Sequence, residues 1–105
     1  MPSTKEYFEF ILEQLSELDG IDSRAMMGEY VIYYRGKVFG GVYDDRFLVK
    51  NVPKARRLMP DAHLELPYPG GSMMLLVDDV DDRDFLKELV EGMYEDIPAP
   101  KGKRK

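Results

Sequence analysis

The sequence contains no cysteine, no tryptophan and a single histidine, His63, in 105 residues. A chain without cysteine can form no disulfide, no thiolate metal site and no thiol nucleophile, and such a composition suits a reducing cytosol. A lone imidazole cannot supply the three or four ligands of a transition-metal site. We therefore predict that His63 is a surface or turn residue and that the chain holds no metal or cofactor.

Long apolar runs are also missing. No stretch approaches the roughly 20 apolar residues of a membrane-spanning helix. Residues 1–9 contain acidic side chains where a secretion signal would be basic and then apolar. We therefore expect a cytoplasmic protein without membrane contact. The length fits one domain, and a hydrophobic fraction of 44% is sufficient for a single core.

Charge is unevenly distributed along the chain. Four of the last five residues are basic, namely Lys101, Lys103, Arg104 and Lys105. Removing these four charges from the net charge of -5 leaves -9 on residues 1–100. An acidic body repels phosphate, so we expect direct nucleic-acid binding to be weak or absent. Residues 101–105 are predicted to form a flexible basic tail after a domain of residues 1–100.

Apolar residues at helical spacing predict a first helix over about residues 4–18. Ser3 and Glu6 have the spacing of a capping box at its start, and Asp19-Gly20 is a typical stop. The pattern then changes to alternation over residues 26–34, 38–43 and 47–50, which predicts three antiparallel strands joined by short turns. Gly40 and Gly41 indicate a bulge or a close approach within the second strand.

The second half of the chain predicts a short helix over residues 53–59, an edge strand over 64–68, a more central strand over 72–77 and a last helix that begins within 78–84. Pro67 places the 64–68 strand at an edge because proline donates no ladder hydrogen bond. The order α-β-β-β-α-β-β-α indicates an α+β fold with a five-stranded antiparallel sheet and its helices on one face.

Residues 24–40, RAMMGEYVIYYRGKVFG, resemble the R-x-M-F-G-G-x-G-I-Y-x-x-G-x-x-F-G signature of the TfoX/Sxy N-terminal domain, although Met27 and Glu29 depart from it. Residues 45–50 and 66–69 are similar to later strands of that family. The resemblance implies a single-domain bacterial member, without the helical C-terminal domain of full-length regulators, and an association with natural competence. The matching positions are Arg24, Met26, Gly28, Tyr33, Gly36, Phe39, Gly40 and Lys50.

No sequence pattern indicates catalysis. None of the four serines lies in G-x-S-x-G, and the Gly70-Gly71 pair precedes a predicted strand without a following lysine, so it is interpreted as a turn. The acidic segment of residues 78–84 lacks the glycine and glutamate spacing of an EF-hand and is interpreted as helix capping. We therefore predict a protein that is not an enzyme.

Three functions from different classes remain. A regulatory or protein-binding module fits the acidic body and the family resemblance. A nucleic-acid accessory protein would use the tail and the basic cluster of Lys50, Lys54, Arg56 and Arg57. A small enzyme fits least. A steep dependence of binding on salt would indicate phosphate contacts and so separates the first two.

A homodimer is the expected assembly, with a heterologous protein as the alternative. An open sheet has two edges, and prolines guard the candidate edge at residues 64–68, whereas the strands near residues 26–34 and 47–50 have no such guard. An unguarded edge is expected to be covered by a partner. Tyr30, Ile32 and Tyr34 can point into the core, which leaves Val31 and Tyr33 on the opposite face. With all helices on one side, this second face is predicted to be an exposed apolar patch and the interface.

Overall fold

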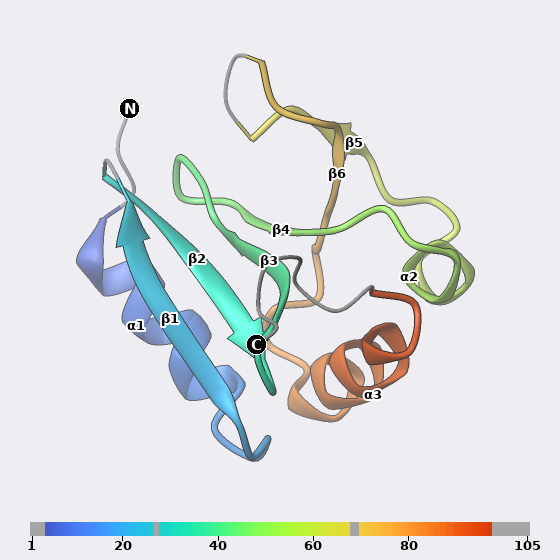
Figure 1. Ribbon diagram of the computed structural model, residues 1–105, viewed down its shortest axis with the longest axis horizontal. Coiled ribbons are helices and arrows are strands. Elements are labelled where there is room, and N and C mark those ends of the chain that lie inside the picture. The colour runs from blue at the N-terminus through green and yellow to red at the C-terminus, as the bar shows by residue number, and fades with distance from the viewer. Residues whose placement is uncertain (1–3, 27, 68–69, 98–105) are drawn as a thin grey trace, which may run out of the picture.

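The computed structural model describes residues 4–26, 28–67 and 70–97 as three helices and one six-stranded antiparallel sheet (Figure 1). The predicted α+β class is confirmed, whereas the predicted number of five strands is wrong. The sheet order is β1-β2-β3-β4-β6-β5. The elements are α1 (Lys5–Gln14), β1 (Ile21–Met26), β2 (Glu29–Tyr34), β3 (Lys37–Val42), β4 (Phe47–Val49), α2 (Pro53–Leu58), β5 (Leu64–Glu65), β6 (Met74–Leu76) and α3 (Arg83–Tyr94).

Helix α1 begins one residue later than the capping-box pattern predicts. Thr4 is its N-cap, and the Thr4 hydroxyl accepts a hydrogen bond from the Tyr7 amide at 3.2 Å. The α-helix ends at Gln14, and turns lead on to Gly20, whose φ of +90° starts the next strand instead of stopping the helix. Ser3 lies outside the described residues, as does the predicted basic tail of residues 101–105.

Strand β1 is the strand that the sequence pattern does not reveal. Three of its six residues, IDSRAM, are polar and four are exposed, yet each one pairs with a residue of β2, from Ile21 with Tyr34 to Met26 with Glu29. An edge strand can be polar because one of its sides and one of its faces meet solvent. The pairing with the strongly β-forming sequence of β2 therefore decides its conformation.

Close backbone contacts explain the two glycines of β3. A Cβ atom on Gly40 would collide with the carbonyl oxygen of Leu48, and one on Gly41 would collide with the carbonyl oxygen of Tyr30. The register between β2 and β3 also shifts between Ile32 and Tyr33. The predicted bulge and close approach are both confirmed.

The strand order shows that neither of the two unguarded strands lies at a sheet edge. Strand β2 is covered by β1, and β4 lies between β3 and β6, so the strands at residues 26–34 and 47–50 provide no open edge. The edges of the described sheet are β1 and the two-residue strand β5, the latter as predicted. The predicted second and last helices are confirmed as α2 and α3, and Asp82 is the N-cap of α3, as the capping interpretation requires.

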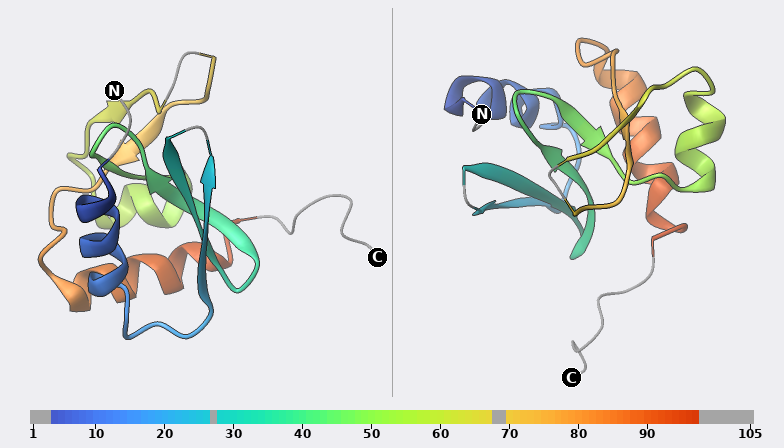
Figure 2. Two further views of the ribbon diagram at one scale, coloured as in Figure 1. Left: turned by 90° about the vertical axis from the view of Figure 1, so that its left-hand side faces the viewer. Right: turned by 90° about the horizontal axis from the view of Figure 1, so that it is seen from above.

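The main core lies between the helices and one face of the sheet. Its strand residues include Ile32, Tyr34 and Val49, and they pack against Ile11 of α1 and Leu89 of α3. Figures 1 and 2 show α1 behind β1 and β2, with no helix in front of these two strands. The prediction that the helices pack on one face is confirmed by this single mixed cluster.

Candidate interaction surface

The helix-free face is the face of the sheet opposite the helices. Because side chains alternate along a strand, Val31 and Tyr33 of β2 point away from Ile32 and Tyr34, as predicted. The paired register extends this face to Asp22 and Arg24 of β1 and to Val38 and Gly41 of β3. It continues through Leu48 of β4 to Leu76 of β6.

Near β4 and β6, the side chains of this face bury one another. Tyr43, Leu48 and Met74 form a second buried cluster, and Leu48 is 0% exposed. A Cβ atom on Gly41 would lie 3.0 Å from the Tyr43 ring, so this ring covers the glycine. Val31, which pairs with Gly41, is 8% exposed. The prediction of an exposed apolar patch is therefore wrong at Val31, which is buried. Side chains of this face pack against one another beside β4 and β6.

The other half of the helix-free face holds a groove of about 580 Å³. Half-buried Tyr33 and its strand partner Val38 line it, together with exposed Asp22 and Arg24 of β1. The remaining lining residues are Gly20, Ser23 and Gly36. Tyrosine and arginine are enriched at binding hot spots because each combines apolar surface with hydrogen-bond donors. The groove therefore combines an aromatic and an aliphatic side chain with charges of both signs.

The model of the TfoX N-terminal domain family matches residues 13–96. The chain belongs to the TfoX N-terminal domain family. It is also similar to a curated protein of Spirochaeta aurantia, described as an uncharacterized 12.7 kDa protein in the trpE 5' region. The two are 28% identical over 105 residues, which cover 99% of this chain and 91% of that protein. No solved structure gives a significant match.

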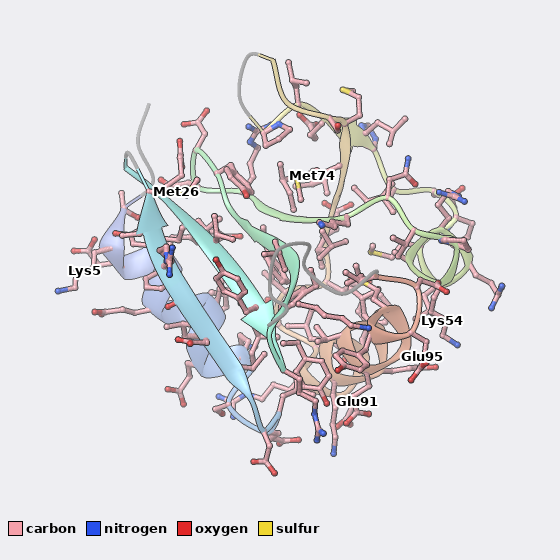
Figure 3. The ribbon with its side chains drawn as sticks, viewed as in Figure 1. Lys5, Met26, Lys54, Met74, Glu91 and Glu95 are labelled. Carbon is pink, nitrogen blue, oxygen red and sulfur yellow. The ribbon has the colours of Figure 1, made fainter. Side chains whose placement is uncertain are left out.

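The TfoX signature positions divide into two groups in this structure. Four of them have structural roles in the sheet. Gly28 and Gly36 have positive φ at turns, Phe39 lies in the core, and Gly40 lies close to the backbone of β4. Lys50 extends the pairing of β4 with β3, since its amide donates to the Phe39 carbonyl at 2.8 Å. Arg24, Met26 and Tyr33 lie instead on the β1–β2 side of the helix-free face, and Met26 is 48% exposed (Figure 3).

Two members of the predicted basic cluster near α2 make local contacts in the structure. Arg56 Nη1 donates to the side chain of Asn51 at 2.6 Å and to its carbonyl at 3.1 Å. The Lys54 side chain lies against Gly92 of α3, and it lines a shallow hollow together with acidic residues of that helix, Glu91 among them (Figure 3). Lys54 therefore lies beside acidic residues, whereas Arg56 contacts the neutral Asn51.

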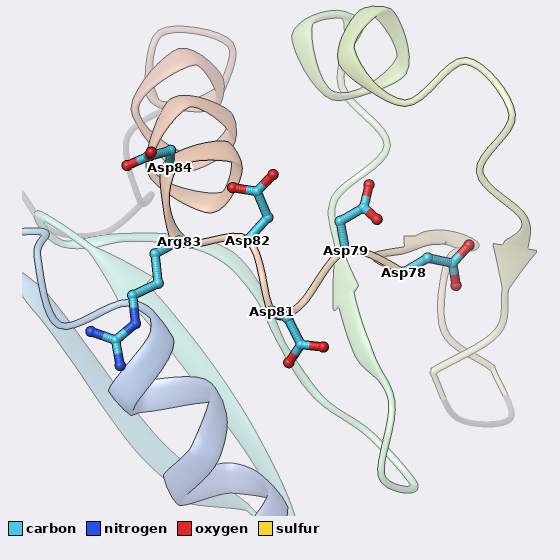
Figure 4. A pocket seen from close by; sticks show the side chains of 6 residues that line it. All are labelled: Asp78, Asp79, Asp81, Asp82, Arg83 and Asp84. Carbon is cyan, nitrogen blue, oxygen red and sulfur yellow. The ribbon is translucent and has the colours of Figure 1, made fainter.

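A second hollow, of about 510 Å³, is lined by Asp78, Asp79, Asp81, Asp82, Arg83 and Asp84 (Figure 4). Figure 4 shows that the carboxylates point in different directions. Asp82 accepts from the Phe85 amide at 3.0 Å, and Arg83 Nε donates to Gln14 of α1 at 3.3 Å. Nowhere in the described part of the chain do three or more acidic or histidine side chains come together as a metal site would need.

His63 is exposed, as predicted, in the segment before β5. Its carbonyl oxygen accepts a hydrogen bond from the Leu76 amide at 2.9 Å, so the backbone of this residue extends the β5–β6 pairing. None of the helices in the described ranges has the length and apolarity required to span a bilayer.

Proposed function

We propose that the chain is a non-catalytic regulatory module that binds another protein through the groove of its helix-free face. The observation that carries this proposal is the meeting of Tyr33 and Arg24, two residue types favoured at binding hot spots, in one groove. No helix lies in front of the two strands that supply them (Figure 1).

The position of the signature residues supports this site. The glycines and Phe39 have roles in turns and packing, which account for them without any partner. Arg24 and Met26 are exposed on an edge strand, where a side chain contributes little to stability, so a role in contact with a partner explains them better.

Membership of the TfoX family supports a regulatory role, in competence or in transcription, as the context of that contact. Such a module acts in the cytoplasm through protein contacts, and its groove needs neither metal nor cofactor. Direct binding to DNA or RNA is not part of the proposal, because residues 1–100 carry a net charge of -9 and Lys54 shares its hollow with Glu88 and Glu91.

Site-specific photo-crosslinking in the native cell tests the proposal. A photoreactive phenylalanine analogue in place of Tyr33 should give a discrete protein adduct. The matched control carries the same analogue in place of Phe10, an aromatic residue of α1 that is 36% exposed away from the groove. Equal adducts from both positions, or an adduct that nuclease removes from the Tyr33 position, would contradict the proposal.

A further inference from the structure

One side of β1 has no neighbouring strand in the described sheet. Within the described residues β1 pairs with β2 alone. The Arg35 amide donates to the Gly20 carbonyl at 2.9 Å. Gly20 therefore marks a hydrogen-bonded position, and every second residue after it also hydrogen-bonds to β2. Residues 22, 24 and 26 therefore direct their backbone groups to β2, and Ile21, Ser23 and Ala25 direct theirs outward. The Ser23 amide agrees with this phase, because it donates to its neighbour Asp22 at 2.8 Å and not to β2.

The outward backbone groups of β1 can pair with the same groups of a second copy of the chain. If a second copy approaches antiparallel, with its two-fold axis at Ser23, the residue numbers of each facing pair sum to 46, as for Ser23 with Ser23. Ile21 then faces Ala25 of the second copy, and these outward groups can form ladder hydrogen bonds in both directions. The same register places Asp22 of each copy opposite Arg24 of the other.

The charges in this register favour the pairing. Asp22 and Arg24 would occupy non-hydrogen-bonded positions, where facing side chains approach most closely. Both lie on the helix-free face and both are exposed, and the one hydrogen bond that the ladder must replace, from the Ser23 amide to Asp22, is exposed as well. A parallel approach, or a register shifted by two residues, would lose the opposition of unlike charges.

The other edge of the described sheet differs from β1. Strand β5 has two residues, and Pro67 follows shortly after it. Arg46 also binds this edge, through Glu65 at 2.8 Å and the Leu66 carbonyl at 3.2 Å. A short strand next to a proline is a typical guard against pairing with another chain.

We propose that two copies of this chain pair through β1, antiparallel about Ser23, to form a symmetric dimer with one continuous sheet. Reciprocal contacts between Asp22 and Arg24 set its register. Each groove then receives Arg24 of the second copy beside its own Asp22, so the dimer completes the border of both grooves. The inference goes beyond the proposed function, because the copies can pair whether or not the groove binds another protein.

Charge reversal tests the register. Asp22→Arg leaves two positive side chains and Arg24→Asp leaves two negative ones, so each variant repels its own copy. We expect the full-length wild type to be a dimer with a dissociation constant in roughly the micromolar range, and each variant to dimerise at least about tenfold more weakly. An equimolar mixture of the two variants should form a heterodimer, and the double variant should recover the homodimer. Light scattering coupled to gel filtration measures all five samples.

Matched controls make the same charge changes elsewhere. Arg57→Asp and Asp61→Arg alter exposed residues outside β1, and both should dimerise as the wild type does. Weakening by the controls equal to that by the β1 variants would assign the effect to net charge and would overturn the proposal. A wild-type monomer at about 100 µM, which lies well above the expected dissociation constant, would overturn it as well.

Proline substitution tests the strand contact separately from charge. Ser23→Pro removes an amide that faces away from β2, so the fold should survive while the dimer is lost. Leu64→Pro is the control on the opposite edge and should leave the dimer intact. Circular dichroism confirms that each variant is folded. A folded Ser23→Pro variant that still dimerises like the wild type would exclude β1 as the interface.

Discussion

The two faces of the sheet differ in how their side chains are packed. The covered face contributes to one continuous core with all three helices, in which Phe39 and Ile32 are completely buried. The helix-free face has a small buried cluster beside β4 and β6, and an open groove beside β1 and β2. Burial is therefore decided by local packing and not only by the presence of a helix, and only the β1–β2 part of the second face remains accessible to a partner.

The largest effect is expected on the covered face. Phe39→Ala should lower the free energy of unfolding by about 3–5 kcal/mol, because it removes a fully buried ring and leaves a cavity beside Phe47. Urea titration of the variant measures the change. Phe10→Ala, at a ring that is 36% exposed, is the control and should cost much less. Equal costs would show that the covered face is not the centre of the core.

Truncation of a side chain in the buried cluster of the helix-free face should also lower the free energy of unfolding strongly. Leu48→Ala is expected to cost about 2–5 kcal/mol, since Leu48 is 0% exposed although no helix residue belongs to its cluster. Leu64→Ala, at a residue that is 50% exposed, provides the comparison in the same urea titration. A loss at Leu48 no greater than that at Leu64 would mean that this second cluster contributes nothing to stability.

The same difference explains which parts of the fold the sequence predicts. Alternation along β2 assigns Ile32 and Val31 to opposite faces, and the Gly40-Gly41 pair indicates the bulge, because both signals are local. Strand β1 escapes prediction because Asp22, Ser23 and Arg24 form a strand only through their pairing with β2. The burial of Val31 and the internal place of β4 also depend on partners distant in sequence, and no local pattern contains them. The groove is missed for the same reason, since two of its charged residues come from β1.

A smaller effect is expected where β5 is fixed to the sheet. Glu65→Gln removes the charge that faces Arg46 at 2.8 Å, in a pair whose side chains are 27% and 32% exposed. We expect a loss of about 0.5–1 kcal/mol in unfolding free energy at low salt and less at high salt. Glu13→Gln, in the pair with Arg83 where Glu13 is 68% exposed, should change stability less. The opposite order would show that Arg46 does not secure β5.

The smallest effect concerns alkaline pH. Burial, and then the charges of Asp45 and Asp81, raise the pKa of Tyr7 above its ordinary value of 10.0. The folded state thus holds the Tyr7 proton more tightly than the unfolded state does. Its stabilising contribution is present below pH about 10 and is lost as the pH rises through the raised pKa. Tyr7→Phe should lessen the fall in stability on going from neutral to strongly alkaline pH in urea titrations, and an unchanged fall would contradict this assignment.

The most direct test of the groove compares binding with stability in one variant. Tyr33→Ala should abolish capture of the protein that cross-links at position 33, and should lower the unfolding free energy by less than about 1.5 kcal/mol, because Tyr33 is only half-buried on an open part of the sheet. Phe10→Ala, the matched aromatic control, should retain capture. Capture that persists in a folded Tyr33→Ala variant would contradict the assignment of the helix-free groove as the binding site.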